Sequence, residues 1–243
     1  PAFIYSVDGR MLLKRPGQRA RPLPLASSRL VEINADGSSV FSTHRSEGRD
    51  LLCRVDALSG EKTAVMRTER EIAGFALLGS GESVLVALNS AEVTELVRVD
   101  VSTCRAESAG LLSWRGRPLM ASQLAVSADG QLLTFVDATE GDLFVREVRS
   151  GQVRQLACPD EEGSPECPRF SPDGSRVLFC QGGQVWVSSS RGGRIVSVYG
   201  NCRHQIVQAF PLGSDGALDH FRNFSTMTAP LAVPAGHLRR RAA

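Results

Sequence analysis

The stretch that decides the fold is FSPDGSRVLF, residues 170–179. Asp173-Gly174 is a dipeptide that supplies the positive φ of a two-residue hairpin turn, and Pro172 suits the entry to such a turn. Apolar residues alternate with polar ones on both sides, which gives each flanking segment one face to bury. The stretch therefore predicts a strand, a tight turn and a second strand.

Weaker copies of this stretch recur along the chain. Their turns lie at Asp36-Gly37, Ser80-Gly81, Asp129-Gly130 and Asp215-Gly216. With Asp173 included, the first turn residues stand at 36, 80, 129, 173 and 215, so the spacings are 44, 49, 44 and 42 residues. This period is typical of a four-stranded propeller blade, and no window has the apolar spacing of a helix. We therefore predict an all-β protein, a β-propeller of four-stranded antiparallel blades.

Four whole blades follow from these turns, each with an inner and an outer strand pair. They are expected at about residues 29–66, 71–112, 122–156 and 168–198. In the first blade, the polar run from His44 to Asp50 predicts a loop between the two middle strands. Trp186 lies in an alternating strand of the fourth blade and is expected in the core.

The two ends of the chain each supply half a blade. Residues 2–15 match the outer strand pair of a later blade, and residues 204–224 contain an inner hairpin. Because joining the halves pairs strand edges that would otherwise stay open, we predict five blades closed by N- and C-terminal strands, in one domain over residues 1–225. The alternative is a fragment of a larger propeller. Residues 16–28 are expected to be a linker and residues 226–243 a disordered tail.

Composition argues against several classes of protein. A content of 42% hydrophobic and 22% charged residues is ordinary for a soluble globular chain. A formal net charge of +2 does not favour a nucleic-acid partner. No apolar run reaches the roughly 18 residues of a membrane span. A start at Pro1 after removal of Met predicts a cytoplasmic protein, although a removed signal peptide would leave the same sequence in a periplasmic or secreted one.

The six cysteines are too few for a disulfide scaffold in a chain of 243 residues. Cys53, Cys104 and Cys180 lie in or beside strand patterns and are expected to be small core residues. Cys158 and Cys167 bracket an acidic loop and are close enough in sequence to form a disulfide in an oxidising compartment. Both states of this pair stay open.

Residues 170–179, followed by Gln184-Val185-Trp186-Val187 and Gly192-Gly193, resemble the repeat of the TolB-like, or WD-repeat-like, β-propellers. The likeness covers about residues 29–225. It implies a rigid disc that binds partners on one face or in its central channel. Peptidase relatives with this propeller carry a separate hydrolase domain, and the sequence has no Gly-x-Ser-x-Gly elbow of that kind.

No constellation of residues predicts catalysis, a metal or a cofactor. The four histidines stand far apart in the sequence and lack metal-ligand spacing: they are His44, His204, His220 and His237. Acidic residues gather in a loop at residues 137–142 and in another at residues 160–166, and a solvated acidic patch is favoured there over a calcium site. We expect no catalytic residue, no metal and no cofactor, which favours a non-enzymatic role.

The loops at one end of the blades predict a binding face rich in arginine and aromatic residues, the types that dominate binding hot spots. The expected contact residues are His44, Arg45, Trp114, Arg115, Arg117 and Tyr199. Trp114 leads this set because it lies in a polar loop with no evident core to enter. The sequence thus predicts a protein-interaction or scaffold module. The alternatives are a propeller with a small-ligand or carbohydrate site in its central channel, and the propeller portion of a larger protein.

Overall fold

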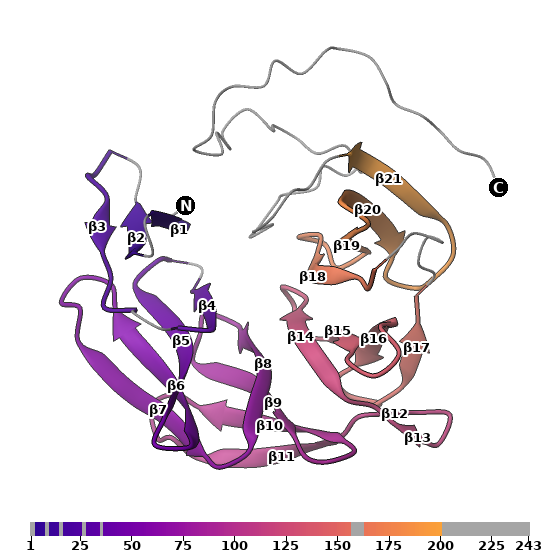
Figure 1. The fold of residues 1–243 in the computed structure, drawn as a ribbon, viewed down its shortest axis with the longest axis horizontal. Coiled ribbons are helices and arrows are strands. Elements are labelled where there is room, and N and C mark those ends of the chain that lie inside the picture. The colour runs from indigo at the N-terminus through magenta and orange to yellow at the C-terminus, as the bar shows by residue number, and fades with distance from the viewer. Residues whose placement is uncertain are drawn as a thin grey trace. The chain divides into compact units, whose positions relative to one another are not determined.

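The computed structural model describes residues 3–7, 10–14, 17–25, 28–34, 36–156 and 163–200, with side chains for all of these except 3–7, 10 and 198–200. All the regular secondary structure in these ranges is β-strand (Figure 1). The strands form four four-stranded sheets, one three-stranded sheet and one two-stranded ribbon, with consecutive strands as neighbours. The predicted all-β chain of four-stranded antiparallel sheets is confirmed.

The four four-stranded sheets follow one another along the chain. The first sheet contains β4 (Leu30–Ile33), β5 (Ser39–Ser46), β6 (Arg49–Asp56) and β7 (Lys62–Thr68). The second contains β8 (Glu71–Leu78), β9 (Ser83–Asn89), β10 (Thr94–Asp100) and β11 (Ala106–Leu111). The third contains β14 (Ala121–Val126), β15 (Leu132–Asp137), β16 (Leu143–Glu147) and β17 (Val153–Gln155). The fourth contains β18 (Glu166–Phe170), β19 (Arg176–Gln181), β20 (Gln184–Ser189) and β21 (Ile195–Gly200).

The chain divides into two compact units. Unit 1 extends to Val126 and includes Asp137–Thr139, whereas unit 2 contains Ser127–Val136 and the residues from Glu140 on. The first and second sheets therefore belong to unit 1 and the fourth to unit 2, with the division falling inside the third sheet, after β14. The described residues contain no helix that is long and apolar enough to cross a membrane.

The organising turn differs from its prediction. Glycine at Gly174 has φ +70°, but Asp173 is not in the positive-φ region, so the two residues do not form a two-residue hairpin turn. Instead Gly174 N donates to Ser171 O at 2.9 Å, and Ser171 Oγ both donates to Asp173 at 2.6 Å and accepts from Arg176 N at 3.0 Å. The result is a four-residue loop held by backbone hydrogen bonds and by the Ser171 hydroxyl.

The earlier copies of this turn use the same chemistry. Ser127 Oγ contacts Asp129 at 2.5 Å and accepts from Leu132 N at 2.9 Å in the third sheet. In the first sheet an asparagine replaces the serine, and Asn34 Oδ1 accepts from Ser39 N at 2.9 Å. In the first, third and fourth sheets the turn is therefore defined by a short polar side chain three residues before the glycine as well as by Asp-Gly, whereas the second sheet has Leu78 at that position.

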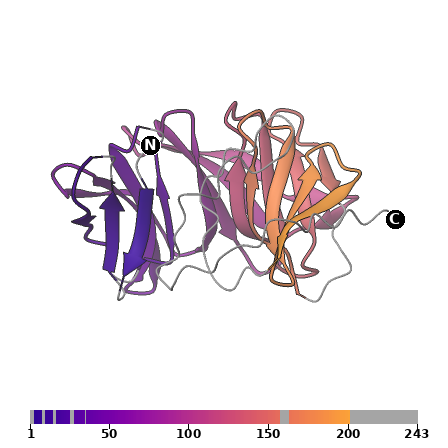
Figure 2. The ribbon, with the colours of Figure 1, turned by 90° about the horizontal axis from the view of Figure 1, so that it is seen from above.

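The N-terminal strands were predicted with their observed bounds, but the following linker was not. β1 (Phe3–Val7) pairs with β2 (Arg10–Lys14), and the two lie side by side in Figure 2. A short third strand, β3 (Arg21–Pro22), pairs with β2 inside the predicted linker. Leu23 and Leu25 beyond it are buried, so apolar contacts hold this segment in place.

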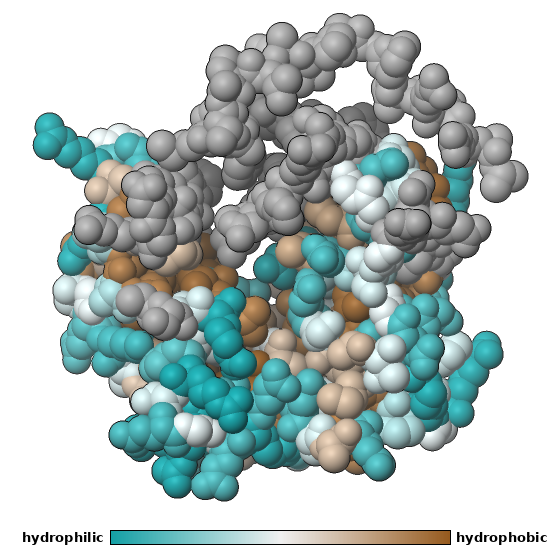
Figure 3. Space-filling model, in the orientation of Figure 1, coloured by the Kyte–Doolittle hydropathy of each residue, from teal (hydrophilic) through white to brown (hydrophobic). Residues whose placement is uncertain are grey.

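Three apolar clusters fill the space between neighbouring sheets. The first joins the first and second sheets around Phe41, Leu52 and Phe75, and another joins the N-terminal sheet to the first sheet around Leu25 and Val40. Figure 3 shows brown side chains inward of the teal rim over β4 and β5. Burial of each such large apolar side chain stabilises the fold by about 1.5–3 kcal/mol.

Unit 2 has its own cluster, which contains Val136, Leu143, Val145, Leu156, Val177 and Phe179. Trp186 packs against this cluster, as the sequence predicted, and its Nε1 donates to Gln181 O at 3.2 Å. The segment expected to complete a fifth blade, residues 204–224, and the tail at residues 226–243 lie outside the described residues. Closure by the two chain ends therefore stays a prediction.

Candidate interaction site

One edge of unit 1 carries most of the predicted contact residues, and we call it the hairpin edge. It is the edge at which β5, β7, β9 and β11 end and β6, β8, β10 and β14 begin. Two side chains join neighbouring sheets here: Asp50 Oδ2 accepts from Ile72 N at 2.8 Å, and Thr94 Oγ1 accepts from Ala121 N at 2.7 Å. Asp50 and Thr94 both stand at or near the start of the third strand of their sheet. This shared role has no local sequence signal and was not predicted.

A short hairpin projects from this edge between β11 and β14. β12 (Ser113–Trp114) pairs with β13 (Arg117–Pro118), where the sequence predicted a loop. The turn residues Arg115 and Gly116 have φ +52° and +80°, the pattern of a two-residue type I′ turn. A non-glycine residue in this region costs about 1–2 kcal/mol, so Arg115 is held there by the pairing on both sides.

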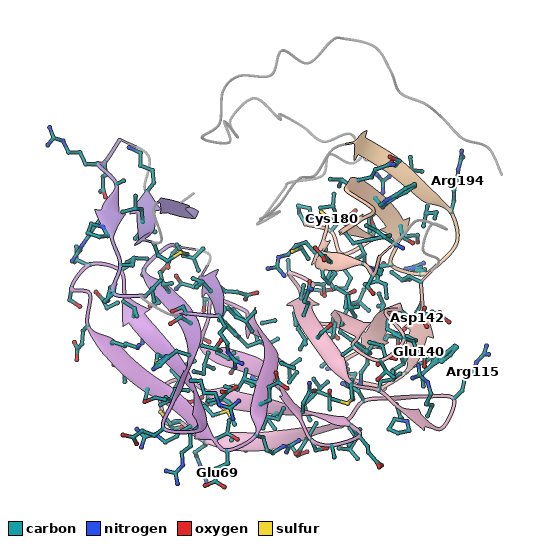
Figure 4. All side chains as sticks on the ribbon, viewed as in Figure 1. Glu69, Arg115, Glu140, Asp142, Cys180 and Arg194 are labelled. Carbon is teal, nitrogen blue, oxygen red and sulfur yellow. The ribbon has the colours of Figure 1, made fainter. Side chains whose placement is uncertain are left out.

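Trp114 and Arg115 form a cation–π pair at the tip of this β12–β13 hairpin. The guanidinium carbon of Arg115 lies 4.5 Å from the centre of the Trp114 ring. Trp114 is half-buried and Arg115 is exposed. In Figure 4 the Arg115 side chain extends away from the ribbon. The hairpin thus places an aromatic ring and a cation at a solvent-facing tip.

Arg117 anchors the base of the hairpin. Its Nη2 donates to Asp137 Oδ2 at 3.0 Å, and Asp137 Oδ1 accepts from Met120 N at 3.2 Å. The Asp137 side chain is 0% exposed and that of Arg117 is 37% exposed. The sequence placed Asp137 in a solvated acidic patch. This was wrong, because the carboxylate is buried and accepts hydrogen bonds from the arginine and from a backbone amide. The two residues of this ion pair are 20 positions apart, so no local sequence pattern predicts it.

The tip of the β5–β6 hairpin holds His44 and Arg45. The predicted loop at residues 44–50 is wrong: β5 and β6 continue to a two-residue turn at Glu47-Gly48, with φ +52° and +76°. Polar residues favoured a loop in the sequence, but these strands extend past the core and their ends are exposed. Arg45 Nε lies 3.9 Å from Asp50 Oδ1.

His44 contacts Cys53, a pair that sequence reasoning did not connect. The Cys53 Sγ lies 4.0 Å from His44 Nδ1. Burial raises the pKa of the Cys53 thiol and, together with the Lys62 charge, lowers the pKa of His44. Both shifts favour the neutral forms, so the pair is unsuited to nucleophilic chemistry at neutral pH.

Cys104, expected in the core, is exposed in a turn at φ +57°.

Several other arginines of the hairpin edge are held in ion pairs. Arg49 Nη2 lies 3.2 Å from Glu69 Oε1. Arg70 Nη1 lies 2.6 Å from Glu95 Oε2, whose other oxygen accepts from Ser108 Oγ at 2.7 Å. Hydrogen bonds from Ser108 and Arg70 lower the pKa of Glu95. The edge is therefore charge-compensated along much of its length.

The remaining predicted residues lie in unit 2. Tyr199 stands on β21, opposite Val185 of β20, and its side chain lies outside the described ones. Of the acidic loops, Glu140 and Asp142 are labelled in Figure 4, and Gly141 between them approaches Ser164 closely. Cys158 lies outside the described residues, so its pairing with Cys167 stays a prediction. No cluster of three metal-ligand side chains occurs within the described ranges.

Four-stranded antiparallel sheets that follow one another along the chain are typical of a β-propeller, and comparison with solved structures confirms this class. The chain is similar to TolB from Acinetobacter baumannii (TM-score 0.60, 12% identity, 79% of this chain). It spans about half of that protein, 49%. It is also similar to a protein assigned as TolB from Agrobacterium tumefaciens (TM-score 0.62, 14% identity, 82% of this chain and 78% of that one).

A third similar structure is a chain of the nidogen/laminin complex, with a TM-score of 0.63 and 15% identity over 82% of this chain and 78% of that one. The predicted likeness to TolB-like propellers is thus confirmed for the fold. At these identities the likeness extends to the fold alone. No protein-family model matches the sequence, and no curated protein matches it.

Proposed function

We propose that this chain is a non-enzymatic β-propeller module that binds another protein through the β12–β13 hairpin. The observation that carries the proposal is the cation–π pair of Trp114 and Arg115 at 4.5 Å, on a hairpin tied to a buried carboxylate by Arg117. Tryptophan and arginine are enriched among residues that dominate binding energy. A rigid hairpin loses little conformational entropy on binding.

The other predicted contacts extend this surface. His44 and Arg45 lie at the tip of the β5–β6 hairpin on the same edge of unit 1, and we assign them a secondary role at the rim. Tyr199 is a separate predicted contact in unit 2. The similar chain of the nidogen/laminin complex belongs to an assembly of two proteins, which supports a protein partner for this fold.

Affinity purification followed by native mass spectrometry tests the proposal. Tagged wild-type protein is recovered at low salt from the cells that encode it, beside the Trp114→Ala/Arg115→Ala variant and the control Arg105→Ala, an exposed arginine at the opposite end of the β10–β11 pair. We expect a stoichiometric protein partner with wild type and control, and its loss with the double variant. A bound metabolite or sugar without a protein partner contradicts the proposal.

The compartment of the interaction is part of the same proposal. The proposed compartment is the cytoplasm, with the periplasm or the medium as the alternative, and fractionation of cells that express the full gene product distinguishes them. Recovery in the periplasm or the medium contradicts it.

A further inference from the structure

Arg115 differs from Arg49, Arg70 and Arg117 of the hairpin edge in what it contacts. Arg49, Arg70 and Arg117 each lie 2.6–3.2 Å from a carboxylate oxygen. Arg115 instead stacks on the Trp114 ring, and it has no carboxylate partner within the part of the chain that the structure describes. Its charge is therefore not compensated by the ion pairs that neutralise its neighbours.

Within the described residues, the Arg115 guanidinium makes no hydrogen bond to another side chain that would occupy its N–H donors. A ring covers the flat face of an arginine, whereas the N–H donors point outward in the guanidinium plane. Carboxylates bind in that plane with two parallel hydrogen bonds. The N–H donors of Arg115 are thus open to such a ligand beside the Trp114 ring.

The backbone conformation of Arg115 is also unusual for a non-glycine residue, and Glu47 of the β5–β6 hairpin shares it. At φ +52° it occupies the first position of a type I′ turn, where Asn, Asp and Gly are the favoured residues. Backbone strain of this kind concentrates at ligand-binding positions. The turn therefore contains an arginine, which suits an anionic ligand, in place of the Asn, Asp or Gly that would suit the backbone better.

Apart from Arg117, the residues of the β12–β13 hairpin beside Arg115 are uncharged. Ser113 and Pro118 pair across the hairpin and are exposed, and Leu111, just before the hairpin, is 60% exposed. Asp137 neutralises Arg117 at the base. The tip therefore presents one cation beside an aromatic ring and small apolar patches, which is complementary to a carboxylate on a partly apolar segment.

We propose that the partner of this hairpin presents an acidic extended segment, and that an Asp or Glu side chain of this segment binds edge-on to Arg115 against Trp114. This assignment rests on the proposed function, because it uses the same hairpin. The recognised group is a side-chain carboxylate and not the carboxylate at the end of a chain.

Fluorescence anisotropy with labelled peptides tests this assignment on the full chain. The probe is an amidated peptide of four Glu-Leu repeats, and its counterpart carries Gln in place of Glu. We expect the Glu peptide to bind at least tenfold more tightly than the Gln peptide at low salt, with affinity that falls as salt rises. Arg115→Asn should weaken binding at least tenfold while keeping or raising the thermal midpoint, because Asn suits the turn.

Two further variants sharpen the result. Arg115→Lys keeps the charge without the planar fork and should bind less tightly than wild type but more tightly than Arg115→Asn. Glu47→Asn makes the same change at the equivalent turn position of the β5–β6 hairpin and should leave binding unchanged.

Equal affinity for the Glu and Gln peptides, or unchanged binding by Arg115→Asn, overturns the assignment. Tight binding of a Gln peptide with a free C-terminal carboxylate overturns the choice of a side-chain carboxylate. If the acidic peptide fails while Trp114→Ala/Arg115→Ala still loses the purified partner, the proposed function stands and the acidic chemistry is wrong. If both experiments fail, the hairpin is not the interaction site.

Discussion

Arg117 Nη2 lies 3.0 Å from Oδ2 of Asp137, a carboxylate whose side chain is fully buried. Removal of the arginine leaves a buried negative charge with only backbone donors. We therefore expect Arg117→Ala to lower the free energy of unfolding by about 1–2 kcal/mol, the lower part of the range for such losses because Arg117 is partly exposed. Urea denaturation measures the change. The double variant with Asp137→Asn should recover part of it, and a loss below about 0.5 kcal/mol would contradict the buried pair.

Gly74 on β8 allows β8 and β14 to approach closely. A Cβ at this position would lie 2.8 Å from Leu124 Cδ1 and 3.2 Å from the Leu124 backbone nitrogen. Because the backbone atom has little room to move, Gly74→Ala should destabilise the chain by about 1–3 kcal/mol. Gly79→Ala is the matched comparison: it meets no atom within 4 Å and suffers only from φ +58°. Thermal unfolding of both variants checks the order, and a smaller loss at Gly74 would refute the steric argument.

Asp173 makes the organising turn sensitive to acid. Hydrogen bonds from Ser171 and then from Ser175 lower its pKa from 3.8 to about 2. A lowered folded-state pKa means that this carboxylate stabilises the fold above about pH 3.8, and that the contribution disappears as the pH falls toward 2. NMR titration of the Asp173 carboxyl checks the value. Ser171→Ala should raise this pKa toward 3.8, and an unchanged titration would show that the hydroxyl is not the main cause.

The cysteines should differ in reactivity according to their burial. Cys53 is buried and its thiol pKa is raised, whereas Cys104 is exposed in a turn. Because the thiolate is the reactive form, iodoacetamide at about pH 8 should modify Cys104 first and reach Cys53 only on unfolding. Peptide mass spectrometry of timed samples resolves the order. Early modification of Cys53 in folded protein would show that the His44 contact is open to solvent.

The architecture was predictable because it depends on local chemistry repeated along the chain. Asp-Gly turns lie at residues 36, 129 and 173. Each turn and the alternating apolar residues beside it lie within ten residues, and these local signals predicted the sheets that the structure contains. The turn type was wrong even so. The hydroxyl of Ser171 reaches across the loop to the backbone of Arg176, and this contact selects a longer loop than the dipeptide implies.

The candidate site was predictable in part. Trp114 and Arg115 were chosen because a tryptophan in a polar Gly/Pro segment lacks a core, and the structure places them together at a hairpin tip. The predicted loop around His44 was wrong, because pairing between β5 and β6 keeps polar residues in strands beyond the core. The role of Trp114, Arg115 and His44 as partner contacts stays a prediction that the binding experiments test.

The sequence by itself determined the class of fold, the number of residues per sheet and the positions of most turns, since each depends on neighbours along the chain. Only the tertiary structure decided which charges are compensated. Arg117 and Arg115 are two residues apart and chemically identical, yet one meets the buried Asp137 and the other meets the Trp114 ring. Asp137 lies 20 residues from Arg117 in the sequence, so their contact forms only when the chain folds, and no local pattern encodes it.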